Sequence, residues 1–138
     1  MAAPARAQSD LGSEAVTNGI RITVEPKYLP DYSEIGSKRY IYGYRVRIVN
    51  ECDDAVRLTR RHWIIVNGEG ERHDVEGEGV IGQQPLIEPG HVYEYSSFCP
   101  LSTRWGTMEG AYTFQHSDGR EFDCEIARFY LVADGESE

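Results

Sequence analysis

The sequence lacks a long apolar run. No stretch of about 18 consecutive apolar residues occurs among its 138 residues, so we expect no membrane-spanning helix. Residues 1–19 contain several alanines but no apolar segment of the length that a secretion signal needs. With 40% hydrophobic and 27% charged residues, the composition is ordinary for a soluble globular protein, and the length suits one domain.

Positive charge is also scarce. The chain has 14 Lys and Arg against 23 Asp and Glu, which gives a net charge of −9. Nucleic acids and anionic membrane surfaces attract proteins that present a basic face. We therefore expect neither a nucleic acid nor a membrane as a partner.

Cysteine is rare. The three cysteines, Cys52, Cys99 and Cys124, are an odd number without a C-x-x-C spacing, which is atypical of a secreted disulfide-stabilised domain. We expect a cytoplasmic protein whose thiols stay reduced and pack as small apolar groups. A disulfide between two molecules is the alternative.

What the sequence does contain is the alternation of apolar and polar residues that is typical of β-strands. The strongest run is YIYGYRVRIVN at 40–50, where tyrosines, valine and isoleucine share one face. Asn67-Gly68 predicts a hairpin between strands at 56–66 and 72–75. Other strands are expected from Ile20 onward and at 91–98, 107–116 and 121–133.

Two of these strands change the parity of their apolar residues. Leu58 and Trp63 face the same side only if an extra residue lies between them, so we expect a β-bulge near 59–61. Ile126 and Phe129 likewise require a bend near Ala127.

About seven short strands separated by turns predict an all-β fold, an antiparallel β-sandwich of the immunoglobulin or fibronectin type III kind. Trp63 is expected to be the buried tryptophan of a central strand, and the missing cysteine pair favours the fibronectin type III variety. We expect a disordered arm at 1–18, one domain at 19–133 and a flexible tail at 134–138.

The segment from Gly77 to Gly82 matches the G-x-G-x-x-G spacing of dinucleotide-binding loops. In those loops a helix follows and binds the pyrophosphate with its first amides. Here Gln83-Gln84-Pro85 follows, and proline leaves no room for that helix. Residues 69–88 also carry six acidic side chains against one arginine. We expect a structural turn, with phosphate binding as the alternative.

Arg57, Arg60 and Arg61 form the one basic cluster. We expect two of them to share a sheet face with Arg45 or Arg47 of a neighbouring strand. The cluster is either a solvated surface or a patch for an acidic protein segment or a small phosphate.

Sequence spacing marks no catalytic residue, cofactor or metal site. The four histidines lie apart, without the short spacings of metal ligands, although the acidic segment that begins at His73 would bind a divalent cation weakly. Cys99 has no neighbouring base to activate it as a nucleophile.

Five segments in order resemble the signature of the ApaG family over residues 20–132. They are RRHWIIVNGEG, VEGEGVIGQQPLIEPG, YEYSSFCPL, WGTMEGAYTF and EFDCEIARFYLV. The resemblance implies a fibronectin type III-like sandwich that binds partners, as in F-box proteins, has no securely assigned catalytic activity, and is genetically associated with cobalt and magnesium efflux. The family usually has glycine where Phe98 stands, and proline where Arg104 and Ala127 stand.

We therefore expect a non-enzymatic module for protein–protein interaction. The expected contact residues lie in loops and are Gly77, Gly79, Gly82, Gln84, Arg104 and Trp105. The alternative is nucleotide or pyrophosphate binding at the glycine-rich loop, aided by Arg60 or Arg61 and a divalent cation. An exposed edge strand would also let two copies pair, so a homodimer stays open.

Overall fold

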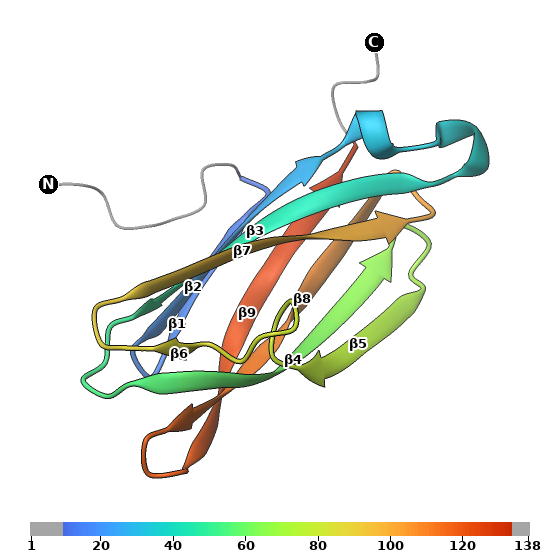
Figure 1. Ribbon diagram of the computed structural model, residues 1–138. Coiled ribbons are helices and arrows are strands. Elements are labelled where there is room, and N and C mark those ends of the chain that lie inside the picture. The colour runs from blue at the N-terminus through green and yellow to red at the C-terminus, as the bar shows by residue number, and fades with distance from the viewer. Residues whose placement is uncertain (1–9, 134–138) are drawn as a thin grey trace, which may run out of the picture.

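The computed structural model describes residues 10–133, which form two antiparallel β-sheets packed face to face (Figure 1). The first sheet has the strand order β1-β2-β3-β7 and the second β5-β4-β8-β9, with the short β6 beside β4. The strands are β1 (Ser13–Thr17), β2 (Ile20–Tyr28), β3 (Tyr40–Asn50), β4 (Val56–Asn67), β5 (Arg72–Glu78), β6 (Leu86–Ile87), β7 (Val92–Leu101), β8 (Trp105–His116) and β9 (Glu121–Val132). Two 3-10 helices, η1 (Pro30–Tyr32) and η2 (Ile35–Ser37), connect β2 to β3. The predicted all-β sandwich is confirmed.

The described residues form nine strands, where the sequence predicted about seven. One addition is β1, which lies within the predicted disordered arm, so that prediction is wrong for Ser13–Thr17. The strand forms because Asn18-Gly19, both with positive φ, makes a tight turn that returns the chain into β2. Residues 1–9 of the arm and the predicted tail at 134–138 lie outside the described residues.

The apolar alternation of β3 faces the centre of the sandwich, as predicted. Trp63 on β4 is 3% exposed and lies opposite this face. Its ring centroid is 5.3 Å from that of Tyr44, 6.0 Å from that of Tyr112 and 5.9 Å from that of Phe129. Burial of large aromatic rings at these separations is a major stabilising contribution to the fold.

Both predicted irregularities are confirmed. The register between β4 and β8 shifts between Leu58 and Arg60, so the chain carries one extra residue there. The register between β8 and β9 shifts opposite Ala127, between the Met108 and Gly110 pairs. Because of the first shift, Arg61 has the same parity as Trp63 and faces the interior.

The two lateral sides of the sandwich differ. On one side β1 and β9 join the sheets: the Tyr130 amide donates to the Leu11 carbonyl at 2.9 Å, and the Ser13 hydroxyl donates to the Ala127 carbonyl at 2.7 Å. On the other side the edge strands are β5 and β7, which do not pair with each other. Within residues 10–133 there is no helix with the length and apolar character needed to cross a bilayer.

Candidate functional site

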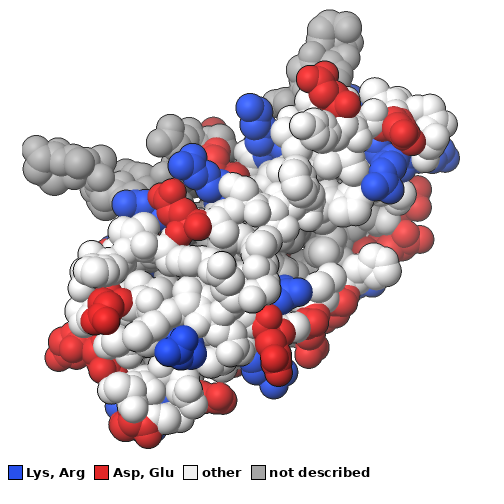
Figure 2. Space-filling view, viewed as in Figure 1, with Lys and Arg blue, Asp and Glu red and all other residues white. Residues whose placement is uncertain are grey.

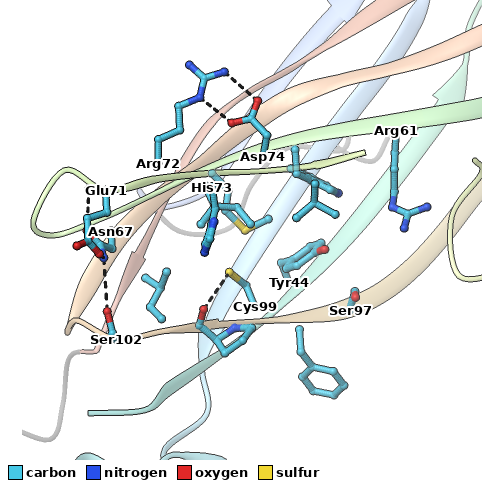
Figure 3. A pocket seen from close by; sticks show the side chains of 17 residues that line it. Tyr44, Arg61, Asn67, Glu71, Arg72, His73, Asp74, Ser97, Cys99 and Ser102 are labelled. Atoms are coloured by element: carbon cyan, nitrogen blue, oxygen red, sulfur yellow. Dashed lines mark hydrogen bonds and ion pairs between the residues drawn. The ribbon is translucent and has the colours of Figure 1, made fainter. Parts of the chain in front are cut away.

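A groove of about 840 Å³ opens between β5 and β7 (Figure 3). Its floor is apolar and comes from both sheets, with Tyr44 and Cys99 from the first and Trp63, Ile65 and Met108 from the second. Of these, Tyr44, Cys99, Trp63 and Met108 belong to the buried core, so the groove leads directly into the centre of the sandwich. An apolar cavity with few polar groups is the usual form of a binding site.

The inner face of β5 lacks a covering strand. None of its seven residues is buried, and Val75 is 41% exposed although its partner across the ladder is the buried Trp63. The first sheet ends at β7 and does not extend over β5. The sandwich therefore has space for one more extended segment beside β7.

Alternate residues of β7 direct their backbone groups to this space. The main-chain N–H of Asn50 donates to the His91 carbonyl at 3.1 Å. The even-numbered residues of β3 therefore direct their main-chain groups to β7 and bond to its odd-numbered residues. Ser96 and Phe98 therefore point their N–H and C=O groups to the free edge. Pro100 has the same parity, and it fits there because proline has no N–H to pair.

Arg61 enters one end of the groove beside Gly77. Its Nη1 donates to the carbonyls of Glu78 at 3.2 Å and Gly79 at 3.0 Å. A Cβ on Gly77 would lie 2.9 Å from the guanidinium nitrogens, so glycine leaves the space that the arginine needs. Within residues 10–133 no carboxylate pairs with Arg61, and its Nε and Nη2 have no acceptor.

Hydroxyl groups lie at the same end. Burial raises the pKa of Tyr44, against the opposing effects of a hydrogen bond with Ser97 and of the Arg61 charge. Tyr95 and Tyr112 share a hydrogen bond between their hydroxyls, and burial raises the pKa of both. Figure 3 shows the Tyr44 and Ser97 hydroxyls on the side of the pocket where the Arg61 side chain lies. These tyrosines keep their protons at neutral pH, and in the Tyr95–Tyr112 pair one hydroxyl donates to the other.

Polar groups of the β4–β5 turn form the opposite end of the groove. The Asn67 amide donates to the Glu71 carboxylate at 2.8 Å and to the Ser102 hydroxyl at 3.4 Å. Figure 2 shows the outer surface from the same side, with acidic side chains gathered along the lower right rim, over β5.

The glycine-rich segment does not form a dinucleotide-binding loop. Gly77 belongs to β5, and no helix follows Gly82. The amides of Gly79, Val80 and Gln83 donate to chain carbonyls at 2.8, 2.8 and 2.9 Å. Gly79 and Gly82 have φ of 63° and 74°, which glycine adopts without strain. The interpretation as a structural turn fits this geometry, because these three amides are bonded within the loop or to β4 and no helix supplies further amides.

Gln84 fastens this loop to β4. Its side-chain amide donates to the Thr59 carbonyl at 3.0 Å, and its own carbonyl accepts from Arg57 Nη1 at 2.8 Å. Through these bonds Gln84 and Arg57 hold the loop against β4.

The predicted basic cluster is not one patch. Arg57 and Arg60 lie on the outer face of the second sheet, whereas Arg61 faces inward after the bulge. The expected shared face with Arg45 and Arg47 is wrong, because β3 and β4 belong to different sheets. Those two arginines instead form ion pairs with Glu94 of β7, at 3.5 and 3.0 Å.

Arg104 and Trp105 lie at the start of β8. Arg104 Nη2 donates to the Ala133 carbonyl at 3.1 Å, and its guanidinium carbon is 5.8 Å from the centre of the Tyr40 ring. Trp105 is 49% exposed.

The six expected contact residues do not form one surface. The glycine-rich loop follows Glu78, which pairs with Arg60, whereas Trp105 precedes Gly106, which pairs with Asn67. Seven residues of extended β4 separate these positions by about 23 Å.

The model of the ApaG domain family matches residues 30–116. The chain belongs to the ApaG family. Protein ApaG of Anaeromyxobacter dehalogenans (strain 2CP-C) is 49% identical over 123 residues, or 89% of this chain and 97% of that protein. Protein ApaG of Brucella canis is 48% identical over 117 residues, or 85% and 90%. The crystal structure of the putative ApaA protein from Bordetella pertussis is 40% identical with a TM-score of 0.81, covering 84% of this chain and 94% of that one.

Phe98 is another residue of the groove. It lies on the groove rim, is 63% exposed and stacks on Tyr32 of η1 at 6.5 Å. The aromatic pair extends the apolar surface of the groove toward the β2–β3 connection.

Two histidines of this ApaG-family chain are each bound to an aspartate. Among residues 10–133 no three His, Cys, Asp or Glu side chains are placed to hold a metal ion together. His62 Nε2 lies 2.8 Å from Asp74, and His116 Nδ1 lies 3.0 Å from Asp54.

Cys99 on the groove floor is expected to be unreactive. It is 3% exposed, and burial raises its pKa to about 12, so almost no thiolate forms at pH 8. We expect it to react with iodoacetamide at least about 100-fold more slowly than an unfolded-chain cysteine. Peptide-level mass spectrometry over a time course measures this, with the partly exposed Cys52 as internal reference. Equal rates at the two cysteines would show that the groove floor is accessible.

The sequence identified only part of this site. Arg61 was grouped with its neighbours, although the bulge that gives it the parity of Trp63 was itself predicted. Tyr44 lies on the predicted apolar face of residues 40–50, and its hydroxyl also reaches the groove. No sequence signal marked Ser97, because the position of an edge strand depends on which strands pair.

Proposed function

We propose that this ApaG-family chain is a non-catalytic binding module that holds an extended segment of a protein partner along β7, in the groove between β7 and β5. The observation that supports the proposal is an uncovered apolar floor directly beside a free strand edge. A segment that adds to β7 completes the first sheet and covers the inner face of β5 at the same time.

The edge of β7 suits pairing better than that of β5. By the same parity argument, the free-edge residues of β5 are Arg72, Asp74 and Glu76, and charged side chains at an edge oppose pairing. Along the groove the free-edge residues of β7 are the uncharged Ser96, Phe98 and Pro100, and Glu94 beyond them is paired with Arg45 and Arg47. Backbone pairing therefore supplies affinity along β7, and the groove selects the side chains.

The proposal is for binding, without catalysis. Cys99 is buried with a raised pKa, and His62 and His116 are each bound to an aspartate. The association of the family with cobalt and magnesium efflux is then explained through a partner, with no metal held by this module. We do not propose a phosphate ligand at the glycine-rich loop, because the amides of Gly79, Val80 and Gln83 are bonded within the chain and no helix follows Gly82.

A substitution at the free edge of β7 tests the proposal. Random decapeptides are selected by display on the whole protein, and their affinities are measured by fluorescence anisotropy. We expect Ser96→Pro to weaken binding at least about tenfold, since it removes an edge N–H and obstructs pairing. The bonds from β7 to β3 stay intact, and Pro100 shows that this parity accepts proline.

The matched control is Ser96→Ala, which keeps the N–H and is expected to bind like the wild type. Melting temperatures establish that both variants fold. Unchanged affinity of the folded Ser96→Pro protein for every selected peptide would contradict binding along β7.

A further inference from the structure

We infer that the groove recognises the C-terminus of its partner: the free α-carboxylate of the bound segment lies at Arg61, within reach of the Tyr44 and Ser97 hydroxyls. This inference rests on the proposed function and adds the chemistry of the occupant. It follows from the free donors at Arg61, from the hydroxyls around it and from the closure of the groove at that end.

Arg61 is held in place and yet keeps donors free. The carbonyls of Glu78 and Gly79 fix Nη1, while Nε and Nη2 have no acceptor among the described residues. One edge of a guanidinium, formed by Nε and Nη2, matches the two oxygens of a carboxylate. The absent side chain of Gly77 provides the space in which the guanidinium lies.

The hydroxyls add neutral donors to this charge. Burial raises the pKa of Tyr44, Tyr95 and Tyr112, and the charge of Arg61 opposes this shift by a smaller amount. Burial therefore keeps them protonated. A carboxylate beside Arg61 therefore meets one cation and the O–H groups of Tyr44 and Ser97, which line the groove, in a partly dry site where charge-assisted hydrogen bonds are strong.

The glycine-rich loop closes the groove just beyond Arg61. The Tyr93 hydroxyl of β7 donates to Gln83 Oε1 at 3.3 Å, which connects the loop to the strand across the space between the sheets. The Gly79 amide fastens the other part of the loop to the Thr59 carbonyl at 2.8 Å. A segment that lies along β7 meets this loop and has to end there, so its last carboxylate, and not an internal side chain, is placed at Arg61.

The open length suits a short terminal peptide. From Arg61 to Asn67 the groove follows six steps of β4, or about 20 Å, which holds five or six extended residues. Trp63 and Ile65 lie on the floor between these ends. The preferred terminus therefore has apolar side chains on the face that points inward.

The net charge of −9 does not prevent carboxylate binding at this point. Asp74 of β5 is bound to Arg72 at 2.7 Å and to His62 at 2.8 Å, and His62 has the parity of the outer face. Charges beyond about 8 Å are largely screened at physiological ionic strength, whereas a direct pair in a partly buried site is not.

The test compares matched peptides with free and blocked ends. Random decapeptides with a free C-terminus are displayed and selected on the whole protein, and each selected sequence is synthesised as the free acid and as the C-terminal amide. We expect the acid to bind about 10- to 100-fold more tightly. Arg61→Gln should remove this difference. Arg60→Gln, which changes the adjacent arginine on the outer face, should leave it unchanged.

The outcomes separate the inference from the proposed function. If acid and amide bind equally and Ser96→Pro still weakens both, β7 binds peptides and the C-terminal preference is wrong. If the affinity depends on Arg61 only in peptides that have an internal Asp or Glu, the site binds a side-chain carboxylate and the inference is again wrong. If no selected peptide responds to Ser96→Pro, both proposals fail. Arg61→Lys is a second variant, expected to retain part of the preference through its charge if Arg61→Gln does not fold.

Discussion

Replacing Trp63 by alanine is expected to lower the free energy of unfolding by about 3–5 kcal/mol. The ring is 3% exposed and contacts three other aromatic rings, from β3, β8 and β9. Its removal leaves a cavity that strands of two sheets cannot fill by small movements. Urea unfolding followed by circular dichroism measures the change.

Trp63→Phe is the matched control. It keeps an aromatic ring at the centre of the sandwich, so a smaller loss is expected than for alanine. A Trp63→Ala protein within about 1 kcal/mol of the wild type would show that the two sheets are not held together at this residue.

Replacing Gly110 by valine is expected to cost at least about 4 kcal/mol, which is a large part of the stability of a small domain. Gly110 of β8 pairs with Trp63 of β4, and a Cβ there would lie 1.9 Å from the His62 carbonyl oxygen. The side chain would have to separate β4 from β8, which are central strands.

Gly36→Ala provides the control, because no atom lies within 4 Å of its added Cβ and its backbone has no positive φ. It is expected to change stability by less than about 0.5 kcal/mol. Both variants are compared by urea unfolding. A Gly110→Val protein as stable as Gly36→Ala would contradict the close approach of β4 and β8.

Local pattern accounts for most of the fold. The strict alternation of β3 predicted its buried face because side-chain direction in a strand has period two. The opposite parities of Leu58 and Trp63 predicted the bulge for the same reason. Apolar alternation does not predict the strand at Ser13–Thr17, because only Ser13 in it is buried. The local signal for this strand is the Asn18-Gly19 turn that follows it.

The candidate site depends on information that local pattern does not contain. A sequence shows which residues alternate, but the edge strands follow from the pairing of β3 with β7 and of β4 with β8. The free edge of β7 and the uncovered face of β5 therefore appeared only with the topology. Arg61 shows how far local pattern reaches. The inward direction of its side chain follows from a predicted bulge, whereas its neighbours Tyr44 and Ser97 come from the other sheet, whose position depends on strand pairing.

Amide hydrogen exchange at the free edge of β7 tests the central claim most directly. It is measured by NMR on the whole protein, with and without a saturating selected peptide that has a free C-terminus. We predict that the amides of Ser96 and Phe98 exchange at least about tenfold more slowly with the peptide, since they gain partners. Unchanged exchange at both amides, together with new protection at Gly82 in the glycine-rich loop, would contradict binding along β7.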